Sequence, residues 1–266
     1  MSAPGRLNGI AARAADMLLR QRPPCGPLFV ASGTVSTMCG RYLLSSPSDI
    51  VSDLFGVDAG ELTPRWNIAP TQSVPIVRPD TDGVRVLDHL RWGLIPPWSK
   101  DGLKGRPLIN ARSETAAGKP SFREAMRARR CLVPADGFYE WKRRGIEKQP
   151  FCIRRADGCP LAMAGLWERW SSPEGAVVES FCILTTTPTP MLAGIHDRMP
   201  VILDPGDYDT WLDAEHHDAA AIQPLLRPCG DDILTALEVR DVVNRPANDS
   251  PDCCEPVSDA GPPSKK

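Results

Sequence analysis

Near the middle of the chain stands Cys131-Leu132-Val133-Pro134-Ala135-Asp136-Gly137-Phe138-Tyr139-Glu140-Trp141-Lys142, which joins two runs of β-forming residues, 131–134 and 137–142. Similar runs recur at 74–78, 84–92, 151–155, 161–167, 179–185, 200–203 and 237–243. The runs are short, and Pro, Gly and Asp separate them, which is typical of strands joined by tight turns. The sequence therefore predicts an α+β fold in which curved, largely antiparallel sheets form an open barrel or sandwich with peripheral helices.

Three short helices are expected around these strands. The first covers residues 47–55, with Ser46 as its N-cap, a proline at its first position and Gly56 at its end. A Ser-x-x-Glu capping box at 121–124 predicts a second helix that runs to about residue 129. Asp-Pro at 204–205 predicts a third helix, which includes residues 211 and 212.

The composition excludes several classes of protein. The chain has 266 residues, of which 42% are hydrophobic and 24% charged, so it can bury a substantial core as one large domain or two small ones. Its longest apolar runs are too short to cross a membrane. It contains neither a GxGxxG nor a GxxxxGKS/T motif, which argues against dinucleotide-binding and P-loop functions. With a net charge of −2, any nucleic-acid partner must bind a local basic groove.

Nine cysteines are spread over the chain, and their odd number argues against a disulfide framework. No pair has the CxxC spacing of a zinc site, and Cys253 and Cys254 are adjacent. Cys131, Cys152 and Cys182 lie in apolar runs, where cysteine usually serves as a small buried hydrophobic residue. We expect a reducing, cytosolic compartment, no metal and no cofactor.

The first 37 residues differ from the rest of the chain. They are rich in arginine and poor in acidic residues, with apolar residues at helical spacing, which fits an organelle transit peptide. The simpler interpretation is that translation begins at Met38 or that the extension is removed. We therefore expect an extension over 1–37, a single catalytic domain over 38–257 and a disordered tail over 258–266.

Met38 and Cys39 suggest an unusual chemistry if Met38 is the true start. Removal of Met38 leaves Cys39 with a free α-amine and a thiol on the same residue. Such an aminothiol condenses with an aldehyde, because the amine forms a Schiff base and the thiol closes it to a thiazolidine ring. Cys39 is thus a candidate nucleophile.

Polar segments also interrupt the strand pattern. The stretch 65–72 is expected to be a loop. Trp98 follows two prolines, and is either a core residue or a rigid, exposed wedge that stacks on an unpaired base. Alternation puts Asn110, Arg112 and Glu114 on one face of an extended segment, either as a solvated edge strand or as a set that binds phosphate or sugar oxygens.

Two residues are candidates for proton transfer. Glu140 lies between two aromatic residues, so partial desolvation would raise its pKa toward the range useful in acid–base catalysis, unless it faces solvent. His196 lies at a predicted helix-to-strand junction beside an acid and a base, which makes it the best proton-transferring imidazole of the four histidines. His89 alternates with apolar neighbours in a predicted strand, and His216 and His217 lie in a polar stretch.

Taken together, these segments resemble the SRAP family, the SOS-response-associated peptidase-like proteins that process abasic sites in single-stranded DNA. The resemblance rests on the motifs MCGRY (38–42), WNIAPTQ (66–72), RWGLIPPW (91–98), LINARSET (108–115), CLVPADGFYEWK (131–142), IHDRMP (195–200) and EPV (255–257). It covers residues 38–257, in matching order and spacing.

The resemblance implies a role for each matching residue. Cys39 becomes N-terminal and links covalently to the abasic sugar, Asn110 positions the ring, and the active site also includes Glu140 and His196. Contacts with DNA are implied for Arg41, Asn67, Pro70, Trp98, Arg112 and Arg198. From the sequence we also expect Arg41, two residues from Cys39, to favour the Cys39 thiolate.

The function predicted in this way is a thiazolidine cross-link between Cys39 and an abasic site, with lyase-like chemistry, which shields the lesion in the DNA damage response. One alternative is a cysteine peptidase or amidohydrolase, self-cleaving before Cys39, with His196 as base. Another is a non-catalytic single-stranded DNA-binding module that uses the basic residues Arg127, Arg129, Arg130, Lys142, Arg143 and Arg144. We expect a cytoplasmic, nucleoid-associated monomer without membrane contact.

Overall fold

The structure, a computed structural model, describes residues 39–213 and 219–257. The expected extension over 1–37, Met38, the tail over 258–266, and His216 and His217 lie outside the described residues. Among the residues that are described, no helix is long and apolar enough to cross a membrane.

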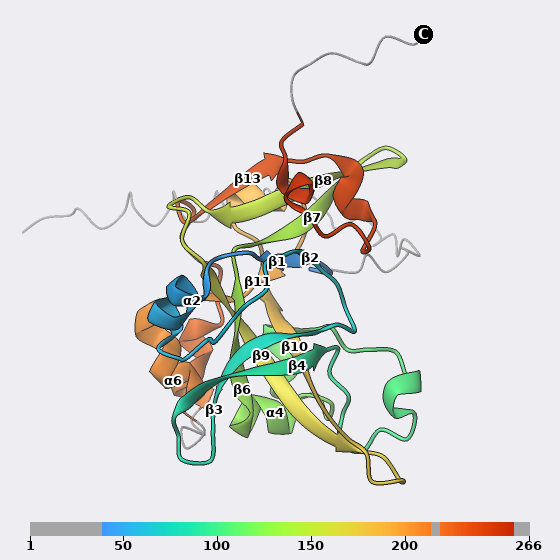
Figure 1. Cartoon of the computed structure of the whole chain (residues 1–266), viewed down its shortest axis with the longest axis vertical. Helices are drawn as coiled ribbons and strands as arrows, with labels where there is room; N and C mark the ends of the chain where they lie inside the picture. The colour runs from blue at the N-terminus through green and yellow to red at the C-terminus, as the bar shows by residue number, and fades with distance from the viewer. Residues whose placement is uncertain (1–38, 214–218, 258–266) are drawn as a thin grey trace, which may run out of the picture. The chain divides into compact units, whose positions relative to one another are not determined.

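The smaller of the two sheets, sheet A, has five strands and is antiparallel throughout (Figure 1). Its order is β13 (Leu234–Glu238), β8 (Glu147–Arg155), β7 (Gly137–Arg144), β1 (Tyr42–Leu44) and β2 (Arg65–Ile68). The central strand β7 starts at a glycine for a steric reason. A Cβ on Gly137 would lie 2.5 Å from the carbonyl oxygen of Ile153, so only glycine allows β7 to approach β8 this closely.

The larger sheet, sheet B, curls into a barrel. Its order is β11 (Met199–Pro200), β10 (Val177–Thr186), β4 (Arg85–Trp92), β3 (Ser73–Pro79), β6 (Arg130–Ala135), β9 (Leu161–Ser171) and β12 (Ile202–Leu203). A further pairing of β9 with β10 closes the ring, and β5 (Asn110–Arg112) joins the side of β10. Among the strands of the described residues, only the pairings of β10 with β4 and with β5 are parallel. The predicted α+β fold with a largely antiparallel barrel is confirmed.

Two apolar clusters stabilise these sheets. The main core fills the barrel and extends to one face of sheet A, where it includes Phe138. The other face of sheet A carries an outer cluster, formed by Leu43, Tyr139, Cys152, Val239, Val243 and Cys253, against which Trp66, Trp141, Val242 and Cys254 pack. Successive residues of β7 point to opposite faces, so Phe138 and Glu140 face the barrel side while Tyr139 faces the outer cluster.

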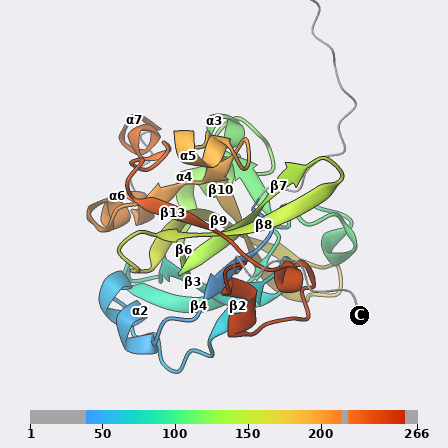
Figure 2. The ribbon, with the colours of Figure 1, turned by 90° about the horizontal axis from the view of Figure 1, so that it is seen from above.

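Short helices lie around the sheets. The α-helices are α2 (Ser48–Phe55), α3 (Ser113–Ala116), α4 (Arg123–Ala128), α5 (Pro190–Ala193), α6 (Tyr208–Leu212) and α7 (Ala219–Ile222). The 3₁₀ helices are η1 (Gly102–Lys104), η2 (Pro205–Asp207), η3 (Gln223–Leu225), η4 (Asp241–Asn244) and η5 (Pro251–Cys254). Helices α2 and α6 lie side by side (Figure 1), with the rings of Phe55 and Tyr208 stacked at a centroid distance of 5.6 Å. The two 3₁₀ helices at the C-terminal end lie beside β2 and β8 (Figure 2).

The predicted helix starts are wrong in detail. Pro47 is the N-cap of α2, and Ser46 does not cap it, because the Ser46 hydroxyl donates to Asp136 at 2.6 Å. The Asp136 carboxylate also accepts from the backbone and hydroxyl of Ser45, so a partner 90 residues away outcompetes the local cap. The capping box at 121–124 does not form either, since α4 begins at Arg123 without a side-chain cap. Gly56 ends α2 in the left-handed conformation, as predicted.

Three strand predictions also need correction. The stretch 65–72, predicted as a loop, contains strand β2 and then a turn. The extended segment 110–114 ends at Arg112, and Glu114 lies on helix α3, so it does not share a strand face with Asn110. The run 237–243 is a strand only to residue 238 and continues as η4.

Candidate active site

Cys39 lies three residues before Tyr42, the first residue of β1, and the antiparallel pairing of β1 with β7 sets it beside Glu140. The pairing extends past the strand end, because the Tyr139 N–H donates to the Arg41 carbonyl at 3.0 Å. The backbone N–H of Cys39 then donates to Glu140 Oε1 at 2.8 Å. Cys39 has a φ of 36°, in the left-handed region that residues other than glycine rarely adopt. Both Cys39 and Glu140 are 2% exposed, so their contact is shielded from solvent.

Strand β10 brings the remaining two predicted catalytic residues to the same place. Asn110 begins β5, which pairs with β10 on sheet B, and its Nδ2 donates to the Cys39 carbonyl at 3.5 Å. His196 lies between α5 and β11, which also pairs with β10. The charge of His196 acts on Glu140 and lowers the pKa of its carboxyl. The structure therefore brings Cys39, Asn110, Glu140 and His196 together where sheet A meets sheet B.

Burial determines the electrostatics of Glu140. Desolvation raises the pKa of its carboxyl, and the nearby His196 and the hydrogen bonds from Cys39 offset part of this rise. A carboxyl of this kind exchanges protons at a higher pH than an exposed glutamate does. Glu140 can therefore accept a proton from a neighbouring amine or thiol and return it within a single reaction.

The expectation that Arg41 favours a Cys39 thiolate is wrong. Burial first, and then Glu140, raise the pKa of the Cys39 thiol well above its usual range, while Arg198 lowers it in part. The Arg41 guanidinium instead faces Asn67 and the Val243 carbonyl. The thiol is therefore protonated at neutral pH and needs a base to become a nucleophile.

The Arg198 side chain lies inside the protein, although the resemblance implies a contact with DNA. Its guanidinium forms two hydrogen bonds with the Glu114 carboxylate, at 2.6 and 2.8 Å, and donates to the Thr185 carbonyl. The Arg198 hydrogen bond lowers the pKa of Glu114, so this pair is ionised at neutral pH. Arg198 is 9% exposed, and it fixes the segment that carries His196.

The imidazole of His196 has two partners that depend on its protonation state. The Arg198 backbone N–H donates to His196 Nδ1 at 3.1 Å, which requires an unprotonated Nδ1 and places the proton of a neutral ring on Nε2. Asp197 Oδ1 also lies 3.1 Å from Nδ1, and this pair forms when the ring is charged. His196 Nδ1 therefore has a partner from the backbone and a partner from a carboxylate.

The other predicted DNA contacts differ in accessibility. Trp98 is 63% exposed, as expected for a wedge and not for a core residue. Arg112 is also exposed, and Pro70 is half-buried in the turn after β2. These three residues have surface available to a ligand. Arg41 is half-buried and Asn67 is fully buried, so these two residues are held by the protein itself.

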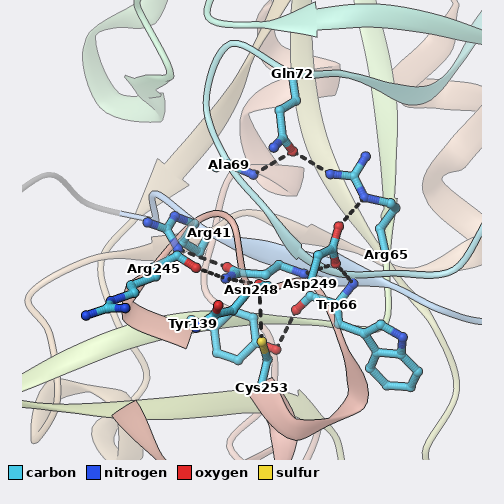
Figure 3. Close-up of polar contacts among 11 residues, drawn as sticks. Arg41, Arg65, Trp66, Ala69, Gln72, Tyr139, Arg245, Asn248, Asp249 and Cys253 are labelled. Carbon is cyan, nitrogen blue, oxygen red and sulfur yellow. Dashed lines mark hydrogen bonds and ion pairs between the residues drawn. The ribbon is translucent and has the colours of Figure 1, made fainter. Parts of the chain in front are cut away.

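Arg41 and Asn67 bind the C-terminal segment, residues 241–254, which contains η4 and η5. Figure 3 shows Arg41 beside Arg245 and Asn248 of this segment. Asn67 Nδ2 contacts the carbonyl oxygens of Val243, Arg245 and Asn248 at 3.1, 3.0 and 2.7 Å. The Asn67 side-chain oxygen accepts from Arg41 Nη1 at 2.9 Å. The amide of Asn67 is therefore fully used, and this favours a positioning role over a direct contact with DNA.

Sequence reasoning missed the partner that completes this network. The Asp249 carboxylate accepts from the backbone N–H groups of Trp66 and Asn67, at 2.5 and 2.9 Å, and from Arg65 Nε (Figure 3). The turn-forming sequence Asn-Asp-Ser-Pro at 248–251 was the only local signal that this segment is ordered. Asp249 and Asn67 together fix β2 at the edge of sheet A.

Replacement of Asn67 by alanine is expected to lower the free energy of unfolding by about 1–3 kcal/mol, since three backbone carbonyl groups and the Arg41 guanidinium each lose a hydrogen bond. Asn244→Ala is the matched control, because Asn244 is exposed and its side-chain oxygen accepts a hydrogen bond from Trp141, while the backbone carbonyl that accepts from Arg41 is retained. Chemical denaturation measures both variants. An equal, small effect of the two substitutions would contradict the positioning role of Asn67.

The fold and the site define a β-barrel protein built around a buried cysteine. The nitrogen and the thiol of this cysteine interact with the Glu140 carboxylate, its carbonyl oxygen accepts from the Asn110 amide, and the charge of His196 acts on Glu140. Comparison with known proteins identifies the family. The chain belongs to the SOS response associated peptidase (SRAP) family, whose model matches residues 38–246. The resemblance stated from the motifs is confirmed.

Individual relatives agree with this assignment. The chain is 43% identical over 223 residues to Abasic site processing protein YoqW of Bacillus subtilis, across 82% of this chain and 99% of that protein. It is 33% identical over 230 residues to Abasic site processing protein HMCES of Gallus gallus, across 74% of this chain and 68% of that protein. A solved structure of a protein from Bacteroides thetaiotaomicron matches with a TM-score of 0.73 and 28% identity, across 82% of this chain and 99% of that one.

Proposed function

We propose that this protein processes abasic sites in single-stranded DNA by forming a covalent cross-link through Cys39. The relatives named as abasic site processing proteins support the substrate. One contact carries the mechanism: the Cys39 backbone nitrogen lies 2.8 Å from Glu140 Oε1. Once Met38 is removed, this nitrogen is an α-amine that already faces a buried proton acceptor.

The first step is condensation of this amine with the ring-opened abasic sugar. Glu140 takes a proton from the α-ammonium group, and the free amine adds to the aldehyde carbon of the sugar. Glu140 then returns the proton to the hydroxyl group, which leaves as water and gives a Schiff base. Its raised pKa suits Glu140 to both transfers, because a carboxyl that holds its proton more tightly is a better base and still an available acid.

The second step closes the ring. The protonated thiol of Cys39 gives its proton to Glu140 or to the imine nitrogen, and the sulfur adds to the same carbon atom. Overall one aldehyde and one aminothiol become one thiazolidine and one water. A carbon bound to nitrogen and sulfur in a ring is no longer an iminium, so the cross-link does not promote β-elimination of the DNA strand.

The remaining site residues position these groups. Asn110 holds the Cys39 carbonyl and so fixes the direction of the nitrogen and the thiol. His196 adjusts the acidity of Glu140 by its charge and can protonate the sugar ring oxygen as the ring opens. Exposed Trp98 and Arg112 would stack on an unpaired base and bind a phosphate.

A peptidase is less well supported by the geometry. The backbone nitrogen and the thiol of Cys39 both interact with Glu140, whereas His196 Nδ1 faces Arg198 and Asp197. A cysteine peptidase instead needs a thiol activated by an imidazole. The proposed reaction requires the protein to be in the cytoplasm, where it meets the cell's DNA. We also propose a monomer, because a single DNA strand needs only one binding groove.

Cys39→Ala is expected to abolish the cross-link. The test mixes protein that begins at Cys39 with a single-stranded oligonucleotide containing one abasic site, and separates the products on a denaturing gel. The unmodified protein should give a heat-resistant adduct, and an oligonucleotide without the abasic site should give none. Binding of the intact oligonucleotide by Cys39→Ala should persist. An equally stable adduct with Cys39→Ala would contradict the proposal.

A further inference from the structure

The outer cluster on sheet A contains three cysteines that the proposed DNA reaction does not use. Cys152 lies on β8 directly opposite Tyr139 on β7, so their side chains share the outer face of the sheet. Cys253 and Cys254 reach the same face from η5. This face is opposite to the one that carries Glu140, which separates the three thiols from the candidate active site.

The contacts within the cluster are specific for two of these thiols. Cys254 Sγ lies 2.9 Å from the Tyr139 hydroxyl, and Cys152 Sγ accepts from Arg154 Nε at 3.4 Å. Cys152 and Cys254 also hydrogen-bond to each other, and Arg154 interacts with both sulfurs. Two thiols from distant parts of the chain thus lie in one cluster beside a guanidinium and a phenol.

These neighbours make the two thiols chemically different. The hydrogen bond from Cys152 lowers the pKa of Cys254, burial opposes this effect, and Tyr139 and Arg154 add to it. The Cys254 hydrogen bond and burial raise the pKa of Cys152. Cys254 is half-buried, while Cys152 is 3% exposed. The accessible thiol is therefore the ionised one, and the buried thiol keeps its proton.

We propose that Cys254 and Cys152 form a peroxide-reactive thiol pair, in which Cys254 is oxidised first and Cys152 resolves it to a disulfide. The Cys254 thiolate attacks one oxygen of a hydroperoxide such as hydrogen peroxide, the O–O bond breaks, and sulfenic acid and hydroxide form. The Cys152 thiol then attacks the Cys254 sulfur, its proton joins the leaving hydroxyl, and water departs. Two electrons from the two sulfurs reduce one peroxide.

The disulfide would fasten the C-terminal segment to sheet A. Cys254 ends this segment, and Asn248 and Asp249 within it hold Asn67 and Arg65. Oxidation would therefore link residues 241–254 covalently to sheet A. In the reduced protein side-chain contacts hold this segment there. This inference concerns the outer cluster alone and does not depend on the DNA reaction.

Peptide mapping tests the pair in the full chain. Reduced protein is treated with hydrogen peroxide, the remaining thiols are alkylated, and the digest is analysed by mass spectrometry. We expect a Cys152–Cys254 disulfide. Cys152→Ser should instead leave a sulfenic acid on Cys254, which dimedone traps, and Cys159→Ser, at an exposed cysteine, should not change the outcome. A Cys253–Cys254 disulfide, or oxidation of Cys159 with Cys254 unchanged, would overturn the proposal.

A second measurement needs no variant, in case Cys152→Ser fails to fold. Cys229 is half-buried like Cys254, but burial raises the pKa of its thiol to about 11. At neutral pH iodoacetamide should therefore label Cys254 at least about tenfold faster than Cys229. Hydrogen exchange over residues 241–254 should then slow after peroxide treatment and recover with reductant. Equal labelling rates, or exchange that does not respond, would contradict the assignment.

Discussion

Replacement of Glu140 by glutamine is expected to slow formation of the abasic-site cross-link by about 10²- to 10⁴-fold, the usual contribution of a positioned acid–base group. Glutamine keeps the size of the side chain and can still accept the hydrogen bond from the Cys39 nitrogen. It cannot take a proton from the amine or return one to the leaving hydroxyl. The observed rate with an abasic oligonucleotide, followed on denaturing gels over time, measures the loss.

The pH dependence separates this role from a structural one. In the unmodified protein the rate should change across the pH range in which Glu140 titrates, which burial places above that of an ordinary carboxyl. Glu140→Gln should lose this part of the profile. Glu114→Gln is a useful comparison, since Glu114 pairs with Arg198 and does not contact Cys39. Its profile should keep the Glu140 transition. A full-rate Glu140→Gln variant would exclude Glu140 as the proton carrier.

The same substitution is expected to stabilise the protein at neutral pH. Because the pKa of Glu140 is higher in the folded than in the unfolded state, its stabilising effect is complete below the unfolded value of about 4.3 and is lost as the pH rises through the folded value. Glutamine carries no charge and does not suffer this loss. Thermal unfolding should therefore show a gain for Glu140→Gln at pH 8 that disappears near pH 4.

A chain that keeps a residue before Cys39 is expected to form no thiazolidine. An amide nitrogen does not add to aldehydes, and the Cys39 thiol alone gives only a reversible adduct that denaturation removes. The sharpest test replaces residues 1–38 by a protease recognition sequence whose cleavage leaves Cys39 first. The protein should be inactive before cleavage and should cross-link abasic DNA afterwards.

The control for this experiment is the fold itself. The hydrogen bond from the Cys39 nitrogen to Glu140 is present with the preceding peptide bond intact, so the fold should persist and the unfolding temperature after cleavage should be no lower than before. Binding of single-stranded DNA should also be similar, because the exposed Trp98 and Arg112 lie on other segments. An equally heat-resistant adduct before cleavage would show that the α-amine is not the nucleophile.

Much of this fold follows from local sequence. The runs at 74–78, 84–92 and 161–167 are strands because β-forming residues are bounded by turn formers, and the residue types of neighbouring side chains suffice to predict them. The position of Gly56 at the end of α2 is equally local, since glycine adopts the left-handed conformation at little cost. Closure of the barrel by β9 and β10 was not predictable, because pairing partners are chosen by tertiary packing.

The site shows the same limit. The prediction that Cys39, Asn110, Glu140 and His196 lie together rested on the family resemblance. Their spacing in the sequence does not by itself require it. Arg41 illustrates why: its sequence distance from Cys39 suggested an effect on the thiol, but alternation along the chain and a carbonyl 202 residues away direct its guanidinium elsewhere. Arg198, which has no sequence proximity to Cys39, is the cation that acts on the thiol.

The backbone of Cys39 carries one more consequence. A φ of 36° crowds its side chain against the preceding peptide unit, and this conformation costs an L-residue roughly 1–2 kcal/mol. That torsion exists only while a carbonyl carbon precedes the nitrogen. Hydrolysis of the bond before Cys39 abolishes it, and the new ammonium group turns freely about the N–Cα axis. If the residues before Cys39 are removed as proposed, the release of this strain favours the cleaved chain over the uncleaved one by about tenfold.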